Sequence, residues 1–283
     1  MKRTYILFNP LAGNGTCAEK AHLLSARYPG AVLHDLTTLG DYAAFFDTLD
    51  ETDSVILCGG DGTLCRFVNE TQGIVFPCGL FYAPAGTGND FANDVMRSAD
   101  GAPAEITRYL QNLPTVTVCG KTLRFLNGVG YGIDGYCCDV GDRMREKGER
   151  KINYAMIAIK GLLFHYVPTS ATVTVDGVTR SYRHVWIAPT MHGRYYGGGM
   201  MPTPDQKRNS DDPTLSLMVM HSASKLKTLA VFPSIFKGTH VRHTDMVQVL
   251  QGKEITVRFD RPAPLQIDGE TVLGVTEYTA RAV

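Results

Sequence analysis

The stretch SVILCGGDGTLCRFVNET, residues 54–71, contains three local signals in direct succession. SVILC (54–58) is an apolar run that is typical of a buried strand. CGGDGT (58–63) is a glycine-rich turn, and TLCRFVNET (63–71) has the spacing of a helix. A strand, a short turn and a helix in this order indicate one unit of a parallel α/β sheet.

The same alternation occurs on both sides of this stretch. We expect further strands at 4–8, 31–36 and 79–83, and helices at 16–28, at 41–50 and from Asp90 onward. Thr16 and Glu19 form a T-x-x-E pattern, which predicts a capping box at the start of the first helix. The first part of the chain is therefore expected to be a Rossmann-like parallel sheet with helices on both faces.

The pattern changes after Pro114 to alternating apolar and polar residues, which are typical of half-buried antiparallel strands. Asp176-Gly177 separates two such runs and predicts a type I′ hairpin. Helices are expected at 152–167 and, less regular because of Pro233, at 225–236. The fold class is thus α/β, with a Rossmann-like parallel-sheet domain at 1–115 and a mostly antiparallel β-sandwich domain at 116–283, whose last residues could pack back on the first domain.

Composition excludes some functions. Lys+Arg and Asp+Glu number 28 each, so the charge balance gives no reason to expect nucleic acid as a partner. No secretory leader and no long apolar segment are visible, and we expect a cytoplasmic protein. The seven cysteines include no CxxC pair, which speaks against a zinc site or a disulfide framework.

The glycine turn raises a chemical question about Asp61. Glycines let a ligand approach the main chain, and the N-terminus of the following helix attracts anions such as phosphate. A carboxylate fits there if a cation bridges it to the phosphate or if it orients another group; a plain tight turn with an Asx hydrogen bond is the alternative. Two further small-residue loops, NPLAGNG (9–15) and PAGTGNDFA (84–92), follow neighbouring strands. No P-loop is present, and no GxGxxG fingerprint follows the first strand.

Six motifs in order resemble the diacylglycerol kinase and sphingosine kinase superfamily, and most closely its small soluble bacterial lipid kinases. They are FNPLAGNG (8–15), GGDGT (59–63) with Asn69-Glu70, PAGTGNDFA (84–92), NGVGYGID (127–134), YGGGM (196–200) and LQIDGE (265–270). The resemblance implies an α/β nucleotide-binding domain, a β-sandwich domain and an active site in the cleft between them. GGDGT alone also occurs in NAD kinases.

The resemblance implies a role for each matching residue. Asp268 would be the general base that accepts the lipid hydroxyl's proton, and Asp61 would hold the nucleotide's Mg²⁺ or join the base network. Residues matching the structural Mg²⁺ site are Asp212, Thr214 and Glu270, although Pro213 stands where glycine is usual. Residues matching the ATP site are Asn9, Pro10, Gly13, Thr38, Gly59, Gly60, Asp61, Gly62, Thr63, Gly86, Thr87, Asn89 and Glu270.

The sequence therefore predicts an ATP- and Mg²⁺-dependent kinase that phosphorylates a hydroxyl of diacylglycerol or a related lipid. An NAD kinase-like enzyme and a nucleotide-binding module without catalysis are the alternatives. Cys65, where asparagine is common, and Pro213 keep the second alternative open. A membrane surface carrying the lipid is the expected partner during turnover, and a homodimer stays open. The sequence IDGE (267–270) is also typical of a simple hairpin turn, which is the alternative to a catalytic role for Asp268.

Two segments could contact that membrane. RMREKGERK (143–151) is rich in basic residues, although a solvated helix face is the simpler interpretation. The helix expected at 152–167 could present apolar residues to lipid, but its single apolar stripe favours packing against the protein core.

Overall fold

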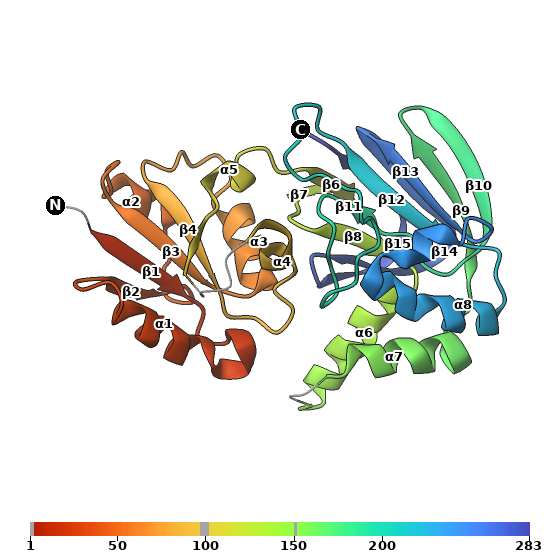
Figure 1. Cartoon of the computed structure of the whole chain (residues 1–283), viewed down its shortest axis with the longest axis horizontal. Coiled ribbons are helices and arrows are strands. Elements are labelled where there is room, and N and C mark those ends of the chain that lie inside the picture. The colour runs from red at the N-terminus through yellow and green to blue at the C-terminus, as the bar shows by residue number, and fades with distance from the viewer. Residues whose placement is uncertain (1–2, 97–101, 150–151) are drawn as a thin grey trace. The chain divides into compact units, whose positions relative to one another are not determined.

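The computed structural model of the chain describes residues 3–96, 102–149 and 152–283 (Figure 1). The chain divides into two compact units, Met1–Asn112 and Leu113–Val283. Among the residues that the structure describes, no helix has the length and apolar character needed to cross a membrane.

The first unit is built on a five-stranded sheet with the order β2-β1-β3-β4-β5. The first four strands run parallel, and the short β5 is antiparallel to β4. Its elements are β1 (Thr4–Phe8), η1 (Ala12–Gly15), α1 (Cys17–Ser25), β2 (Val32–Asp35), α2 (Tyr42–Asp47), β3 (Ser54–Gly59), α3 (Asp61–Glu70), β4 (Gly79–Pro84), α4 (Asp90–Val95), β5 (Ala104–Glu105) and α5 (Thr107–Leu110).

Helices cover both faces of this sheet, as predicted, because successive strand residues point to opposite sides. On one face, Ile6 and Ile56 pack with Ala21 and Leu24 of α1. On the other, Tyr5 meets Phe45 of α2 edge to face, with ring centroids 5.5 Å apart.

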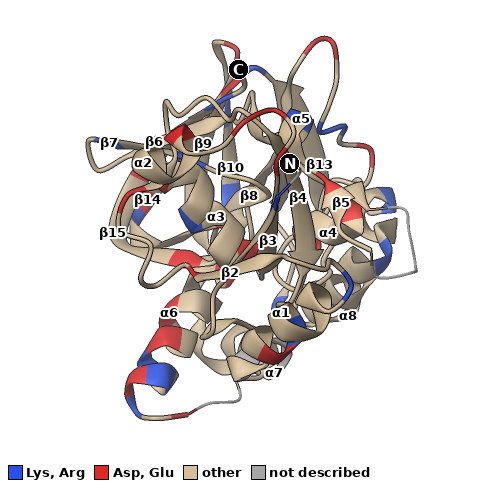
Figure 2. Ribbon diagram, turned by 90° about the vertical axis from the view of Figure 1, so that its left-hand side faces the viewer, with Lys and Arg blue, Asp and Glu red and all other residues tan. Residues whose placement is uncertain are grey.

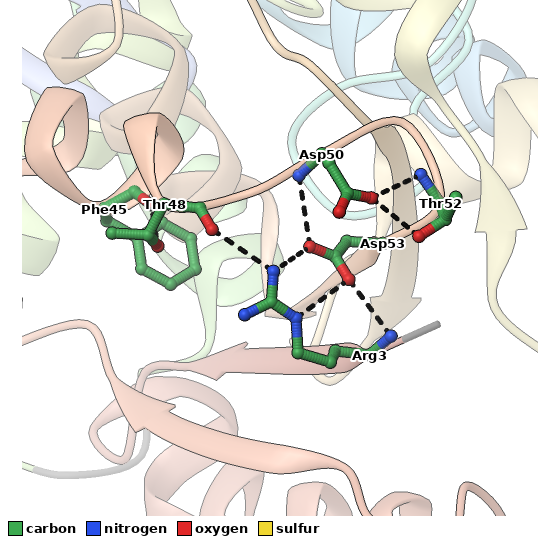
Figure 3. Close-up of polar contacts among 6 residues, drawn as sticks. All are labelled: Arg3, Phe45, Thr48, Asp50, Thr52 and Asp53. Atoms are coloured by element: carbon green, nitrogen blue, oxygen red, sulfur yellow. Dashed lines mark hydrogen bonds and ion pairs between the residues drawn. The ribbon is translucent and has the colours of Figure 1, made fainter. Parts of the chain in front are cut away.

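The amino ends of β1 and β3 are tied by a buried carboxylate (Figure 3). Asp53 is almost fully buried, and its oxygens accept hydrogen bonds from Arg3 Nη2 at 2.6 Å, Arg3 Nε at 3.1 Å and the Asp50 N–H at 3.1 Å. The hydrogen bonds from the Arg3 side chain lower the pKa of Asp53 to about 2. This pair lies at the opposite end of the strands from the glycine loops.

Two local predictions in this unit were wrong. Thr16 does not cap α1, because its backbone is already helical (φ −86°, ψ −7°) where the preceding 3₁₀ turn runs into the helix. Its hydroxyl donates instead to the Gly13 carbonyl at 2.8 Å. The helix after GGDGT begins at Asp61, two residues earlier than expected, so the glycine turn and the helix N-terminus overlap.

The second unit contains an antiparallel sheet with the order β13-β12-β11-β8-β14-β15-β6-β7, from which β9 and β10 branch at β14. Its elements are β6 (Thr115–Val118), β7 (Lys121–Arg124), β8 (Gly128–Tyr131), α6 (Ile133–Glu146), α7 (Tyr154–Lys160), η2 (Gly161–His165), β9 (Thr169–Val175), β10 (Val178–Val185), β11 (Thr190–Met191), β12 (Leu215–Met220), α8 (Lys225–Val231), η3 (Phe232–Lys237), η4 (Thr239–Arg242), β13 (Val247–Gly252), β14 (Glu254–Ile267) and β15 (Glu270–Arg281).

Local sequence signals hold well in this unit. Asp176 and Gly177 have φ of 46° and 82°, as the predicted type I′ hairpin requires. Pro233 marks the point where α8 gives way to a 3₁₀ turn after Val231. The helix expected at 152–167 runs from Tyr154 to His165 and finishes as a π-helical turn.

Candidate active site

The three glycine-rich loops of the first unit follow β1, β3 and β4 and pack directly against one another. A Cβ at Gly60 would lie 3.1 Å from the Gly86 Cα, and one at Gly13 would collide with the Ala85 carbonyl oxygen. The N–H of Ala85 donates to the Gly59 carbonyl at 2.7 Å. These glycines therefore allow close contact between loops, whether or not a ligand is bound.

Two asparagines hold the loops in shape. Asn9 Nδ2 donates to the Thr63 hydroxyl at 3.2 Å, which links the first loop to the start of α3. Asn89 is left-handed (φ 54°), and its amide both accepts from the Gly86 N–H and donates to the Gly86 carbonyl, each at 3.0 Å. Because the Asn89 amide makes both of these bonds, we assign it to loop structure first.

The carboxylate of Asp61 caps a neighbouring helix. Its Oδ2 accepts from the Asp90 N–H and its Oδ1 from the Phe91 N–H, both at 2.9 Å. These two amides open α4, whose own N-cap residue, Asn89, makes no side-chain cap. Of the options left open by the sequence, the structure shows Asp61 orienting another group, namely the loop and helix that follow β4.

The N-terminus of α3, in contrast, has no side-chain cap. Gly60 occupies the N-cap position, and the first backbone hydrogen bond of the helix runs from Leu64 to the Gly60 carbonyl. The amides of Gly62 and Thr63 thus lie outside the helical ladder. Gly62 is exposed, a Cβ on it would meet nothing within 4 Å, and its φ is not positive. Neither packing nor backbone conformation in the protein explains why this residue is glycine.

The remaining candidates in this unit lie around the same loops. Thr87 is exposed, and Pro10 is partly buried in the first loop. The Thr38 hydroxyl donates to the Asp35 carbonyl at 3.0 Å, just after β2. Cys65 is buried, and its carbonyl accepts from Asn69 Nδ2 at 3.0 Å, so Asn69 bonds to the backbone one turn earlier.

In the second unit, Asp268 lies in the turn between β14 and β15. Asp268 and Gly269 have φ of 47° and 92°, so the hairpin that IDGE predicted is present. The Asp268 carboxylate also accepts the backbone N–H groups of Leu126, of Asn127 at 2.7 Å and of Gly128 at 3.0 Å. These three donors fix the orientation of the carboxylate. The turn residue is thus also an anchored acid.

Arg208 and His192 contact the same backbone segment, residues 126–128, through oxygen atoms of Leu126 and Asn127. Arg208 donates from Nη1 to the Leu126 carbonyl and from Nη2 to Asn127 Oδ1, the latter at 2.9 Å. His192 Nδ1 is 3.1 Å from the same Leu126 carbonyl. Sequence reasoning missed both residues, because they come from irregular segments without periodicity or motif.

Asp134 of the NGVGYGID motif is buried at the start of α6. Its Oδ2 accepts from the Tyr196 hydroxyl at 3.1 Å and its Oδ1 from the Gly135 N–H at 3.0 Å. A Cβ at Gly130 would overlap this carboxylate, so the motif's glycine makes room for its aspartate. Burial is the main cause that raises the pKa of Asp134 to about 6.

The residues predicted for structural Mg²⁺ have other partners or face solvent in the structure. Asp212 pairs with Lys253 at 2.6 Å on the surface, and the Thr214 hydroxyl accepts from Gln251 Nε2 at 2.8 Å. Glu270 is exposed at the start of β15. Within the described ranges, no group of three or more His, Cys, Asp or Glu side chains could hold a metal ion.

Comparisons with known proteins agree with this division of the chain. Residues 3–119 match the model of the diacylglycerol kinase catalytic domain, and residues 127–282 match that of the YegS C-terminal NAD kinase beta sandwich-like domain. The chain is 29% identical over 273 residues to a diacylglycerol kinase of Mycobacterium tuberculosis, covering 89% of this chain and 83% of the relative. It is 25% identical over 286 residues to a diacylglycerol kinase of Bacillus subtilis, covering 95% and 90%.

A solved structure has the same fold. The crystal structure of a diacylglycerol kinase from Bacillus anthracis superposes with a TM-score of 0.61 at 19% identity, over 99% of this chain and 94% of that chain. The family model for the second domain alone spans more than half of the 283 residues. The chain therefore belongs to the lipid kinase family in which a diacylglycerol kinase catalytic domain precedes a YegS C-terminal NAD kinase beta sandwich-like domain.

Proposed function

We propose that this protein is an ATP-dependent lipid kinase that phosphorylates a hydroxyl of diacylglycerol or a related lipid. The observation that carries the proposal is the open N-terminus of α3. Its amides lie outside the helical ladder beside Gly62, a glycine that no contact or backbone angle in the protein requires. Backbone N–H groups and the helix dipole together favour a phosphate at such a position.

The nucleotide's phosphates would therefore lie against Gly62 and Thr63, with Gly59, Gly60 and Gly86 shaping the floor. Asp61 and Asn89 would act through the loops they hold, since their oxygens accept backbone amides. Asn9, Pro10, Gly13, Thr38 and Thr87 stay proposed ATP contacts, as does Glu270. The magnesium ion that accompanies ATP stays a prediction of the family resemblance.

Asp268 is the proposed general base for the lipid hydroxyl. Phosphoryl transfer depends mainly on positioning and charge neutralisation, so an ordinary carboxylate can accept the proton late in the reaction. The three backbone donors would fix the direction in which its remaining lone pairs point. The choice of a lipid acceptor rests on the names of the relatives, which are diacylglycerol kinases.

The substitution Gly62→Ala tests whether the open N-terminus of α3 binds the phosphates of ATP. Alanine at this helical position meets no atom in the protein, so the fold should be retained or gain up to about 1 kcal/mol from helix propensity. The methyl group would occupy the proposed phosphate position, and the ATP dissociation constant should rise by roughly 10-fold or more, as measured by calorimetry. Gly40→Ala, also exposed and free of contacts within 4 Å, is the matched control.

The acceptor is tested separately, by phosphate transfer from ATP to diacylglycerol in mixed micelles, with NAD as a competing acceptor. Phosphorylated diacylglycerol supports the proposal. Phosphorylated NAD would favour the NAD kinase alternative, and ATP binding without any product would favour a non-catalytic module. Normal ATP affinity in Gly62→Ala would contradict the proposed phosphate position.

A further inference from the structure

Helix α7 and the turn η2 that continues it are apolar on both faces. Ile157, Ala158 and Leu162 are buried in the core of the second unit; of these three, only Leu162 belongs to the apolar stripe expected from the sequence. The outward face carries Met156, Ile159 and Phe164, whose side chains are 47%, 45% and 72% exposed. Core packing explains the first face only, because a surface helix normally turns polar residues to water.

The segment formed by α8 and η3 repeats this arrangement. Val231 and Ile235 are buried in the same core, whereas Leu226 is 77% and Phe236 44% exposed. We call Met156, Ile159, Phe164, Leu226 and Phe236 the apolar helical surface.

The two segments lie side by side in the second unit. Lys225 Nζ of α8 lies 3.5 Å from the Leu163 carbonyl of η2, and Figure 1 shows α7 and α8 on the same side of the sheet. Both segments also pack into one core cluster. Their exposed side chains thus belong to one region of the surface.

The charges within the two segments are of one sign. Residues 152–167 and 221–244 contain no Asp or Glu, whereas Lys160, Lys225, Lys227 and Lys237 lie among the exposed apolar side chains. Lys227 pairs with Asp245, just outside the second segment.

Helix α6 differs, since its acidic and basic residues alternate (Figure 2). Arg143 pairs with Asp139, and Arg145 pairs with Asp142. Residues 143–149 of the basic stretch thus fit the simpler interpretation, a solvated helix face. Residues 150–151 of that stretch lie outside the described residues.

We propose that the apolar helical surface docks onto an anionic lipid bilayer, with Phe164 and Leu226 entering the interface and the lysines contacting the headgroups. This inference rests on the proposed function, because a kinase of diacylglycerol must reach a substrate that resides in the bilayer. Segments that bind a membrane interface combine exposed apolar side chains with neighbouring lysines. The apolar contacts and the charge attraction each add to the binding free energy.

A second copy of the chain is the competing occupant. A two-fold dimer would bring the same surface of two copies together, so lysine would face lysine without any carboxylate from either segment to offset it. A bilayer with negative headgroups supplies the missing charge instead.

The test is co-sedimentation of the full chain with vesicles of phosphatidylcholine containing phosphatidylglycerol, compared with phosphatidylcholine alone. We expect binding to the anionic vesicles that weakens as salt increases. Leu226→Glu and Phe164→Glu should each lower the partition coefficient by roughly 10-fold or more, because an apolar contact is lost and a negative charge is added.

Val178→Glu is the matched control, since Val178 is 60% exposed in the second unit but lies on β10, outside this surface. The added charge of Val178→Glu alone should lower the partition coefficient by no more than about 2-fold. Thermal melts of all three variants should match the wild type, because the substituted side chains are exposed.

Equal binding by wild type, Leu226→Glu and Phe164→Glu would overturn the proposal. So would an equal loss in Val178→Glu, or variants that turn a dimer into a monomer on size exclusion without changing vesicle binding. The vesicle assay contains no ATP and needs no turnover. The docking proposal can therefore fail while the kinase assay succeeds, and the kinase proposal can fail while vesicle binding is observed. If both proposals hold, Leu226→Glu and Phe164→Glu keep wild-type turnover on a short-chain diacylglycerol that is dissolved as monomers.

Discussion

Replacing the buried Asp134 by asparagine should stabilise the protein, and only above acidic pH. Burial raises the pKa of Asp134 from 3.8 to about 6, against the opposing hydrogen bonds from the Gly135 N–H and the Tyr196 hydroxyl. Between these two values the folded chain holds a proton that the unfolded chain releases. The free energy of unfolding therefore falls as pH rises from about 4 to about 6, and it levels off above that.

The size of the effect follows from the same two pKa values. A difference of about 2 pKa units corresponds to about 3 kcal/mol of stability that wild type loses between acidic and neutral pH. Asparagine cannot ionise, and its carbonyl oxygen can still accept from Tyr196. For a unit of this length, about 3 kcal/mol corresponds to roughly 6–12 °C in melting temperature.

The assay compares the melting temperatures of wild type and Asp134→Asn by circular dichroism at about pH 4 and about pH 7. We expect a difference that grows in favour of the variant on going from acid to neutral pH. Asp211→Asn, on an exposed loop, is the control for removing one negative charge. A difference that stays the same at both pH values would show that Asp134 is not a buried carboxylate under desolvation.

Three further predictions concern the anchors of the two units. Asp268→Asn should abolish turnover while leaving ATP affinity unchanged; because the carboxylate also anchors backbone amides, a melting curve must accompany the assay, and normal turnover would remove this residue from the mechanism. Asp61→Ala should leave the amides that open α4 without their acceptor and destabilise the protein by about 1–3 kcal/mol in urea unfolding, and unchanged stability would refute the capping role. Arg3→Leu should destabilise the protein at neutral pH. The depressed pKa of Asp53 contributes stability that is present above about pH 4 and lost as pH falls towards 2, so the gap to wild type should narrow in acid, and a constant gap in melting temperature would contradict this.

The amino-acid sequence by itself determined those features that depend on neighbours along the chain. Residues 54–71 predicted a strand, a turn and a helix, and Asp176-Gly177 predicted its hairpin, because backbone conformation and apolar periodicity are local properties. The order of six motifs also indicated the family, which the domain models confirmed.

Only the tertiary structure decided which groups the individual site residues contact. Asp61 caps a helix that begins 29 residues later in the chain, and the Asp268 carboxylate holds amides 140 to 142 residues away. Gly60 is small because Gly86 approaches it, whereas Gly62 has no such neighbour. The outward apolar face of α7 likewise became visible only once its other face was buried. The physical reason is that these roles depend on which distant groups meet in space, and composition and periodicity record only what is adjacent in sequence.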